Sequence, residues 1–245
     1  MRADKLVDKT SHIDNASEEL ISRCGELSGF IVKRSPTCAD ASAKLYNSQH
    51  NIINNTTDGI FANKLKQSMP NLPIEDEGRL NDYKIREHFI KRVYLYYHAK
   101  QLLLKPIKLD SLQEFHANNK MMLHLHRPQS LINLGRLLAT ETGMPMEQLV
   151  KSYHSVYIRS FNHIATRNQH YSILQRTFKL INNKINSRDR KDIQDHLSSY
   201  LKGYLPLVAP IVLLKHYANH FSVDSLVRQS YLSPYPEDLC LMNNI

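Results

Sequence analysis

The sequence predicts a mainly α-helical protein in which a small α/β unit precedes a domain built from helices alone. GFIV at 29–32 is the clearest strand signal, whereas apolar residues recur at helical spacing from residue 82 onward. A length of 245 residues suits one large domain or two ordinary ones. Seven Gly and no Trp argue against a Gly-rich phosphate-loop enzyme or a Gly-punctuated β-barrel.

The first 80 residues are typical of part of an α/β unit. Apolar residues between 13 and 27 fall at helical spacing, and the GFIV strand follows them and runs into a loop at Ser35-Pro36. Polar residues 40–58 indicate a long loop or a weak helix, and a second helix is expected over 58–67.

After residue 82 the sequence predicts one helix after another. A long helix over 83–104 stops before Pro106 and bridges the predicted domains, residues 1–104 and residues 105–245. Apolar spacing then marks a helix from Leu112 to Leu125 and another that ends before Gly143. Further helices are expected over 146–166, 169–185, 189–202 and 207–221, the third of them capped by Asp189. The two prolines of YLSPYP at 231–236 predict an extended tail packed on the helices.

The chain carries a basic surplus that lies mainly in its C-terminal part. The 32 Lys and Arg exceed the 23 Asp and Glu by nine. Residues 1–100 have a net charge of +2, and residues 101–245 have a net charge of +7 together with nine of the thirteen His. Such a surplus favours an anionic partner, nucleic acid first and an acidic membrane surface second.

Three features predict a cytoplasmic protein. The three Cys form neither an even set nor a CxxC pair, so a disulfide framework is not expected. The first twenty residues lack the apolar core of a signal peptide. The longest apolar run, residues 205–214, is interrupted by two prolines and is too short to span a bilayer, so no membrane partner is expected.

Cys38 is the best-placed reactive group of the N-terminal part. It follows the predicted strand in KRSPTC, and ligands of open α/β sheets collect where strands end. The neighbouring Lys33 and Arg34 favour the thiolate, which is the form that attacks or binds metal. The alternative is a small buried residue in a turn, the commoner role of an isolated Cys.

Four phrases in this part resemble a known family. They are GFIVKRSPTC at 29–38, DGIFA at 58–62, LPIEDEGRL at 72–80 and IREHFIKRVYLY at 85–96. Together they resemble the later half of the catalytic domain of thiouracil and tRNA 4-thiouridine desulfurases, which carries a 4Fe-4S cluster. The resemblance implies that Cys38 is a cluster ligand, that Ser35 lies beside the cluster near the departing sulfur, and that the sulfur passes to a cluster iron while water replaces it on the base.

The family's other catalytic segments are missing. Neither its first strand with a Cys nor its later Cys-Pro-Glu segment occurs, and Cys24 lies on the helix before the strand rather than at a strand end. A cubane cluster takes about three or four thiolates. We therefore expect a truncated α/β unit that lacks the N-terminal half of the domain, and a chain that holds no cluster by itself. The sequence leaves open a truncation, a misassigned start and a degenerate copy.

The remainder of the chain resembles the helical YbgA-like domain that follows the desulfurase domain in tRNA-acting members. The matching phrases are EFHANNK at 114–120, NLGRLLA at 133–139, YLKGYLPLVAPIVLLKHY at 200–217 and QSYLSPYPEDL at 229–239. The resemblance implies a domain that holds tRNA. Two polar positions depart from the family pattern, in SILQR at 172–176 and LMN at 241–243.

A set of basic residues with interleaved tyrosines is the strongest functional candidate of this domain. Lys and Arg neutralise phosphates, and aromatic rings stack on unpaired bases. The set comprises Lys105, Lys108, Lys120, Arg127, Arg136, Lys151, Arg159 and Arg167 with Tyr153 and Tyr157. For each of its members the alternative is a solvated basic face. Arg188, Arg190 and Lys191 form a second small cluster, diluted by two Asp.

Two other groups of residues are better explained by structure. His116, His124 and His126 suggest a metal site, but core or surface histidines on a helix are the stronger interpretation. The acidic run at 75–77 suggests paired catalytic carboxylates, but it is expected to cap a following helix and pair with Arg79 or Arg86.

The function predicted from the sequence is that of a desulfurase relative with an incomplete catalytic domain, which binds tRNA or another RNA through its basic helical domain. One alternative is an active iron–sulfur desulfurase completed by a partner chain, a dimer mate or a missing N-terminus. The other is a helical protein-interaction domain. The oligomeric state stays open.

Overall fold

The structure is a computed structural model that describes residues 18–19, 23, 26–33, 60–104, 106–139 and 143–243. It is mainly α-helical, as predicted, and it divides into two compact units, residues 1–97 and residues 98–245. The division falls inside helix α3 (Tyr83–Leu104), whereas the sequence placed the boundary at the end of that helix. No helix in the described ranges is long and apolar enough to cross a membrane.

The first unit contains a small parallel sheet. Strand β1 (Phe30–Val32) pairs with β2 (Ile74–Asp76), with Phe30 opposite Ile74, and helix α2 (Ile60–Ser68) lies between them in the chain. Parallel neighbours need such a crossover connection. Leu65, Met69, Leu72 and Ile74 form the core of this unit. The α/β character expected here is thus present, although the second strand was not predicted.

The acidic run at 75–77, which ends β2, has a structural role. Glu75 Oε1 lies 2.7 Å from the Nε of buried Arg79, and Asp76 Oδ1 accepts a hydrogen bond from the Arg79 backbone N–H at the start of the short helix η1 (Arg79–Asn81). Arg86 donates to the Leu80 carbonyl instead. The expected pairing with Arg79 is confirmed, and it gives the buried guanidinium a carboxylate partner.

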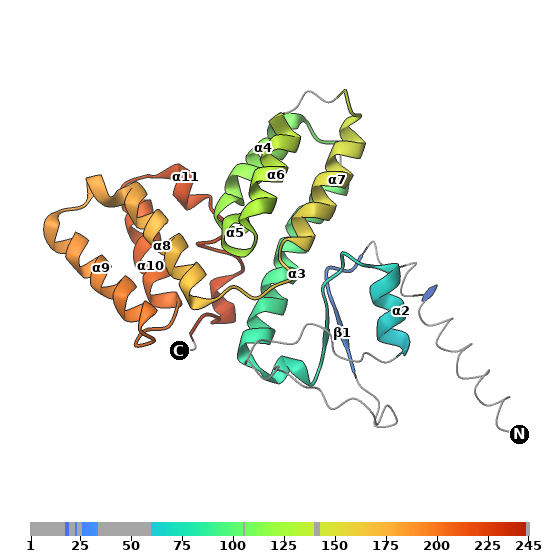
Figure 1. The fold of residues 1–245 in the computed structure, drawn as a ribbon, viewed down its shortest axis with the longest axis horizontal. Helices are drawn as coiled ribbons and strands as arrows, with labels where there is room; N and C mark the ends of the chain where they lie inside the picture. The colour runs from blue at the N-terminus through green and yellow to red at the C-terminus, as the bar shows by residue number, and fades with distance from the viewer. Residues whose placement is uncertain are drawn as a thin grey trace, which may run out of the picture. The chain divides into compact units, whose positions relative to one another are not determined.

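The second unit is all-helical (Figure 1). After α3 come α4 (Leu109–Asn118), α5 (Lys120–His126), α6 (Pro128–Ala139), α7 (Met146–Arg159), α8 (Arg167–Ile181), η2 (Asn182–Lys184), α9 (Ser187–Leu201), α10 (Val208–His220), α11 (Asp224–Val227) and η3 (Glu237–Leu239). Helices α8, α9 and α10 pack on one another, and α5 packs against both α6 and α8.

Side-chain caps mark the starts of α8 and α9. Thr166 and Gln169 form a reciprocal capping box at the start of α8. Asn186, not Asp189, caps α9: the Asn186 side chain accepts from the Asp189 backbone N–H and donates to the Asp189 carboxylate. The predicted cap was wrong because an Asn three residues earlier already satisfies that N–H group.

The single helix predicted from Leu112 to Leu125 is two helices. Asn119 leaves helical geometry at φ −106° and ψ 5°, and its buried side chain joins several segments. Its Oδ1 accepts from the hydroxyls of Tyr157 on α7 and Ser230 near the C-terminus, each at 2.8 Å. Its Nδ2 donates to the Phe115 carbonyl, also at 2.8 Å. The break therefore places an amide where three segments meet.

The C-terminal tail packs on the helices as predicted. Tyr231, Leu232 and Tyr235 are buried, and the Tyr231 hydroxyl lies 3.1 Å from Nδ1 of His170 on α8. The Ser230 backbone N–H donates to the Asn118 carbonyl. The tail thus completes the core rather than forming a separate arm.

We expect Asn119→Ala to lower the free energy of unfolding by about 2–4 kcal/mol, because the buried Tyr157 hydroxyl loses its acceptor. Adding Tyr157→Phe removes that orphaned hydroxyl, so the double variant should be less destabilised than the sum of the single variants by about 1–2 kcal/mol. Urea unfolding of the four proteins measures the cycle. Gln129→Ala, which removes an exposed contact to Asn133, is the control and should change the free energy of unfolding little. If the losses of stability of the Asn119 and Tyr157 variants simply add in the double variant, the network is contradicted.

Candidate nucleic-acid interface

The basic residues predicted from the sequence are distributed over α4 to α8 and their ends. Lys108 precedes α4, Lys120 begins α5, Arg127 follows α5, Arg136 lies on α6, Lys151 and Arg159 lie on α7, and Arg167 begins α8. All except the half-buried Arg167 are exposed. Lys105 lies outside the described residues, as do Ser35 and Cys38 of the desulfurase-like loop.

Arg167, Lys151 and Arg159 of this set have partners inside the unit. Arg167 donates to the Tyr200 carbonyl at 2.7 Å and lies over the Tyr200 ring, 5.2 Å from its centre, so it caps the end of α9. Lys151 pairs with Glu147 at 2.5 Å, and Arg159 donates to the Ser155 hydroxyl. Arg167 thus has a structural role.

The tyrosines of the predicted set cannot stack on bases, and this part of the prediction is wrong. Tyr153 and Tyr157 are completely buried, where their rings stack on each other and pack edge-on against Phe115. Burial raises the pKa of both hydroxyls above the ordinary value. His154 is buried as well. The apolar face of α7, which includes Leu149 and Val150, was the signal that these rings belong to the core.

The histidines considered for metal binding lie apart on two helices. His116 on α4 contacts the Tyr153 hydroxyl through Nδ1 at 3.1 Å, and His126 on α5 contacts the His163 carbonyl through Nδ1 at 2.8 Å. Both are buried, and burial lowers the pKa of His116 to about 4, helped by the charge of Lys120. In the described part of the chain no three His, Cys, Asp or Glu side chains lie where they could hold a metal ion.

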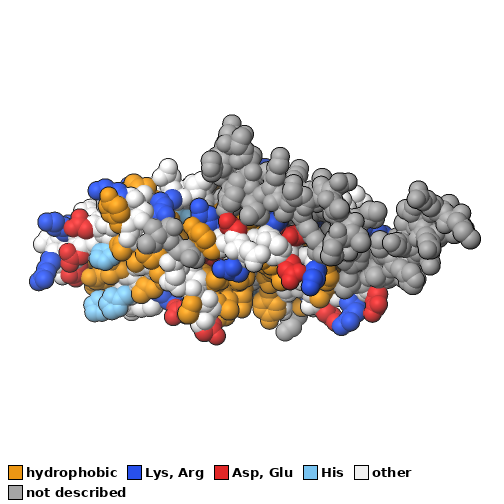
Figure 2. Space-filling view, turned by 90° about the horizontal axis from the view of Figure 1, so that it is seen from below, with side chains coloured by type: hydrophobic (Ala, Val, Ile, Leu, Met, Phe, Trp, Pro, Cys, Tyr) orange, Lys and Arg blue, Asp and Glu red, His pale blue; other side chains and the backbone are white. Residues whose placement is uncertain are grey.

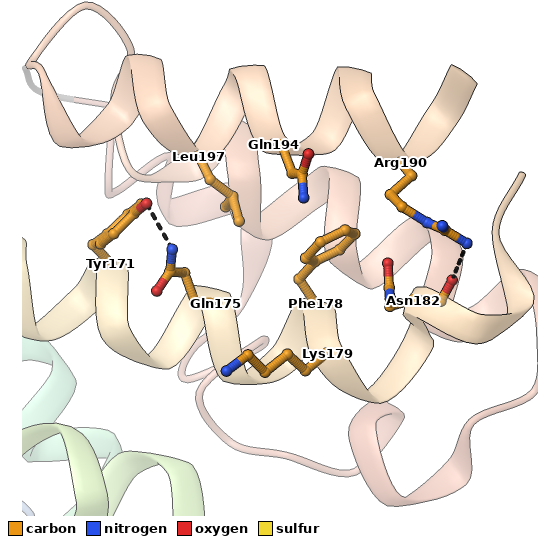
Figure 3. Close-up of a pocket in the computed structure, with 8 residues that line it drawn as sticks. All are labelled: Tyr171, Gln175, Phe178, Lys179, Asn182, Arg190, Gln194 and Leu197. Carbon is orange, nitrogen blue, oxygen red and sulfur yellow. Dashed lines mark hydrogen bonds between the residues drawn. The ribbon is translucent and has the colours of Figure 1, made fainter. Parts of the chain in front are cut away.

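A groove of about 510 Å³ between α8 and α9 brings together residues that the sequence analysis did not combine (Figure 3). Buried Phe178 and Leu197 form its apolar floor. Its other lining residues are polar or aromatic: Tyr171, Gln175, Lys179 and Asn182 from α8 and its end, and Arg190 and Gln194 from α9. The combination of aromatic, amide and cationic side chains in one concave site is typical of ligand pockets.

The polar groups of the groove are only partly satisfied. Gln175 Nε2 donates to the Tyr171 hydroxyl at 2.7 Å, and an Arg190 NH2 group donates to the Asn182 and Ile185 carbonyls at 3.1 Å. Among the described residues, the buried Asn182 Oδ1 and Arg190 Nε have no hydrogen-bond partner. An unsatisfied acceptor and an unsatisfied donor therefore lie buried beside the groove, where an ordered water would satisfy them.

A strip of ring side chains lies along the end of α10. His216 and His220 are exposed and stack at 6.2 Å, and Tyr217 stacks on Phe221 at the same distance. Lys184 donates to the Phe221 carbonyl, and Asp189 hydrogen-bonds Tyr217. Lys184 and Asp189 lie between Asn182 and Arg190 of the groove in the sequence, so contacts from this segment join the strip to the α8–α9 connection.

The net positive charge of the chain lies within residues 120–236. Residues 120–236 contain fifteen Lys and Arg against six Asp and Glu, a net charge of +9 that equals the charge of the whole chain. Lys and Arg side chains are spread among hydrophobic ones over the face in Figure 2 rather than gathered in one patch. The helical unit therefore presents a diffuse positive field.

Residues 120–236 match the family described as "Protein of unknown function (DUF1722)". The matched residues lie in the second unit, which is therefore similar to that family. The chain is 20% identical over 166 residues to "Uncharacterized protein YbgA" of Escherichia coli (strain K12), an alignment that covers 67% of this chain and 98% of that protein. No solved structure matches the chain. The resemblance of the first unit to desulfurases stays a prediction.

The second unit should show a His116 imidazole that titrates near pH 4, measurable by NMR. Its pKa is lowered below the unfolded value of about 6.5, so the unfolded chain takes up a proton at this residue before the folded chain does. The free energy of unfolding should therefore fall as the pH drops from about 6.5 to about 4. His116→Gln should show a shallower fall over that window; an equally steep fall would assign the effect to other groups.

Proposed function

We propose that the YbgA-like domain binds RNA, in the first place tRNA, and accepts an unpaired nucleotide in the groove between α8 and α9. The observation that carries the proposal is the groove itself, with its aromatic, amide and cationic side chains in a domain of net charge +9. We propose tRNA in particular because the chain resembles the tRNA-acting desulfurases.

Each kind of side chain in the groove suits one part of a nucleotide. Tyr171 offers a ring at the rim, and Phe178 offers an apolar floor on which a base can stack. Gln175, Asn182 and Gln194 can hydrogen-bond the edge of an unpaired base, and Asn182 Oδ1 is the acceptor without a partner among the described residues. These groups recognise single-stranded RNA better than a duplex, whose base edges are occupied.

The cations near the groove suit the phosphate backbone. Lys179 lines the groove, and Arg176, one residue beyond Gln175, is exposed. Neither side chain has a carboxylate partner among the described residues, and the charge of Arg176 acts on His124 of α5. His216 and His220 on α10 offer further exposed rings to a flanking base.

Exposed apolar residues favour a second candidate, a protein-interaction domain. Leu180 and Val212 are each 58% exposed, and Tyr204 is 73% exposed. Binding through such residues is insensitive to salt, whereas phosphate binding weakens steeply as salt rises. Salt dependence therefore distinguishes the two functions.

For the first unit, desulfurase activity by this chain alone is not proposed. A 4Fe-4S cluster takes about three or four thiolates. Of the three cysteines, Cys240 lies exposed in the second unit, and Cys24 and Cys38 lie outside the described residues. Among the described residues Cys240 alone is a thiol, and one thiolate does not make up such a ligand set. Iron and acid-labile sulfide analysis of anaerobically purified protein tests this, and stoichiometric cluster would restore the active-enzyme alternative.

We expect the full chain to bind tRNA with an affinity that falls steeply between 50 and 200 mM salt, as measured by fluorescence anisotropy. Lys179→Gln should weaken binding and lower the slope of log affinity against log salt by about one.

Tyr171→Ala should weaken binding of a single-stranded RNA by about fivefold to a hundredfold through lost stacking.

Arg228→Gln is the matched control, because it removes one exposed charge whose partner is Glu114 on α4 and not a groove residue. An equal loss with Arg228→Gln and Lys179→Gln would contradict the groove. Binding that does not change with salt would contradict RNA as the ligand and favour the protein-interaction function.

A further inference from the structure

A second pocket, of about 410 Å³, lies among α4, α5 and α6 on residues that the groove does not use. Leu131 and Leu138 of α6 form apolar walls. His116 supplies a ring nitrogen, and Lys120 supplies an ammonium group. None of these residues lines the groove between α8 and α9, so the pocket is a separate site.

The protonation of His116 follows from its buried partner. The Tyr153 hydroxyl is completely buried, and within the described chain its sole polar partner is His116 Nδ1, at 3.1 Å. A buried hydroxyl must donate its proton to avoid the cost of an unpaired donor. Tyr153 therefore donates to Nδ1, and in the neutral imidazole the ring proton is on Nε2.

The Nε2–H group is directed toward space left by a glycine. A Cβ added to Gly135 would lie 3.8 Å from His116 Nε2, and Gly135 lines the same pocket. Gly135 is inside α6, where glycine is unfavourable relative to alanine, and no positive φ requires it there. The missing side chain keeps the ring nitrogen open to the pocket.

Lys120 adds a full positive charge beside this donor. Its side chain is exposed and close enough to disfavour protonation of His116. In the described part of the chain no acidic side chain lines the pocket. The pocket thus offers an N–H donor fixed by Tyr153 and an ammonium group, against apolar walls.

From this arrangement we infer that the pocket binds a phosphate group, held by His116 Nε2–H and the Lys120 ammonium. Lys is a common point-charge ligand of phosphate, and a neutral imidazole donates to an oxyanion without needing a proton from solvent. The phosphate can come from free inorganic phosphate or from the backbone of an RNA.

The test is NMR of the ¹⁵N-labelled imidazoles in the full chain at neutral pH, titrated with inorganic phosphate. We expect His116 to carry its proton on Nε2 and to show a saturable shift change with phosphate. Lys120→Gln should weaken this binding by about tenfold or more, and Lys191→Gln, an exposed lysine of α9, should leave it unchanged. A proton on Nδ1, or no saturable shift, would overturn the site.

Gly135→Ala separates binding from folding. Since the added methyl faces only His116 Nε2 within 4 Å and alanine favours a helix, the melting temperature should rise by about 2–4 °C while phosphate binding is lost. A stabilised variant that binds phosphate as before would contradict the inference. A competition experiment identifies the source of the phosphate. If RNA displaces phosphate from the wild-type protein, the pocket binds the nucleic-acid backbone. If RNA does not displace it, the pocket binds free phosphate.

Discussion

The arrangement of the helical unit depends on the buried amide of Asn119. By leaving helical geometry it ends α4 and starts α5, and its Oδ1 and Nδ2 connect Tyr157, Ser230 and Phe115. A continuous helix would carry residues 120–126 away from α6 and α8, against which α5 packs. A polar group buried at such a junction is costly unless every partner is in place, so the network favours this one arrangement.

The same network determines which surface is available for ligands. Tyr157 and Tyr153 are held inside, so the rings that appear in the sequence beside basic residues are not at the surface. In turn, Tyr153 fixes the outward nitrogen of His116. Accessible rings lie elsewhere, among them Tyr171 in the groove and His216 on α10. Packing of the core thus moves the candidate recognition surface from α7 to the α8–α10 side.

Local patterns in the sequence predicted much of the fold and little of the candidate site. The strand of GFIV, the long helix over 83–104, the pairing of Glu75 with Arg79 and the packed tail all depend on neighbouring residues, and all are present. The break at Asn119 could not be predicted because apolar spacing continues through it. The groove could not be predicted either, since Gln175 and Arg190 come from different helices and meet only through packing of α8 on α9.

The charge of the domain argues for an anionic ligand over a purely structural role. Several of the fifteen Lys and Arg in residues 120–236 have partners inside the protein: Arg167, Arg190 and Lys184 donate to backbone carbonyls, and Lys151, Lys215 and Arg228 pair with exposed carboxylates. Exposed pairs contribute at most about 1 kcal/mol each, and an uncompensated surplus destabilises the compact state through self-repulsion. A fold that needed only stability would gain from fewer cations. Phosphates bound along α8 or in the pocket of His116 would offset that repulsion, so the surplus is best understood as a property of the complex rather than of the isolated chain.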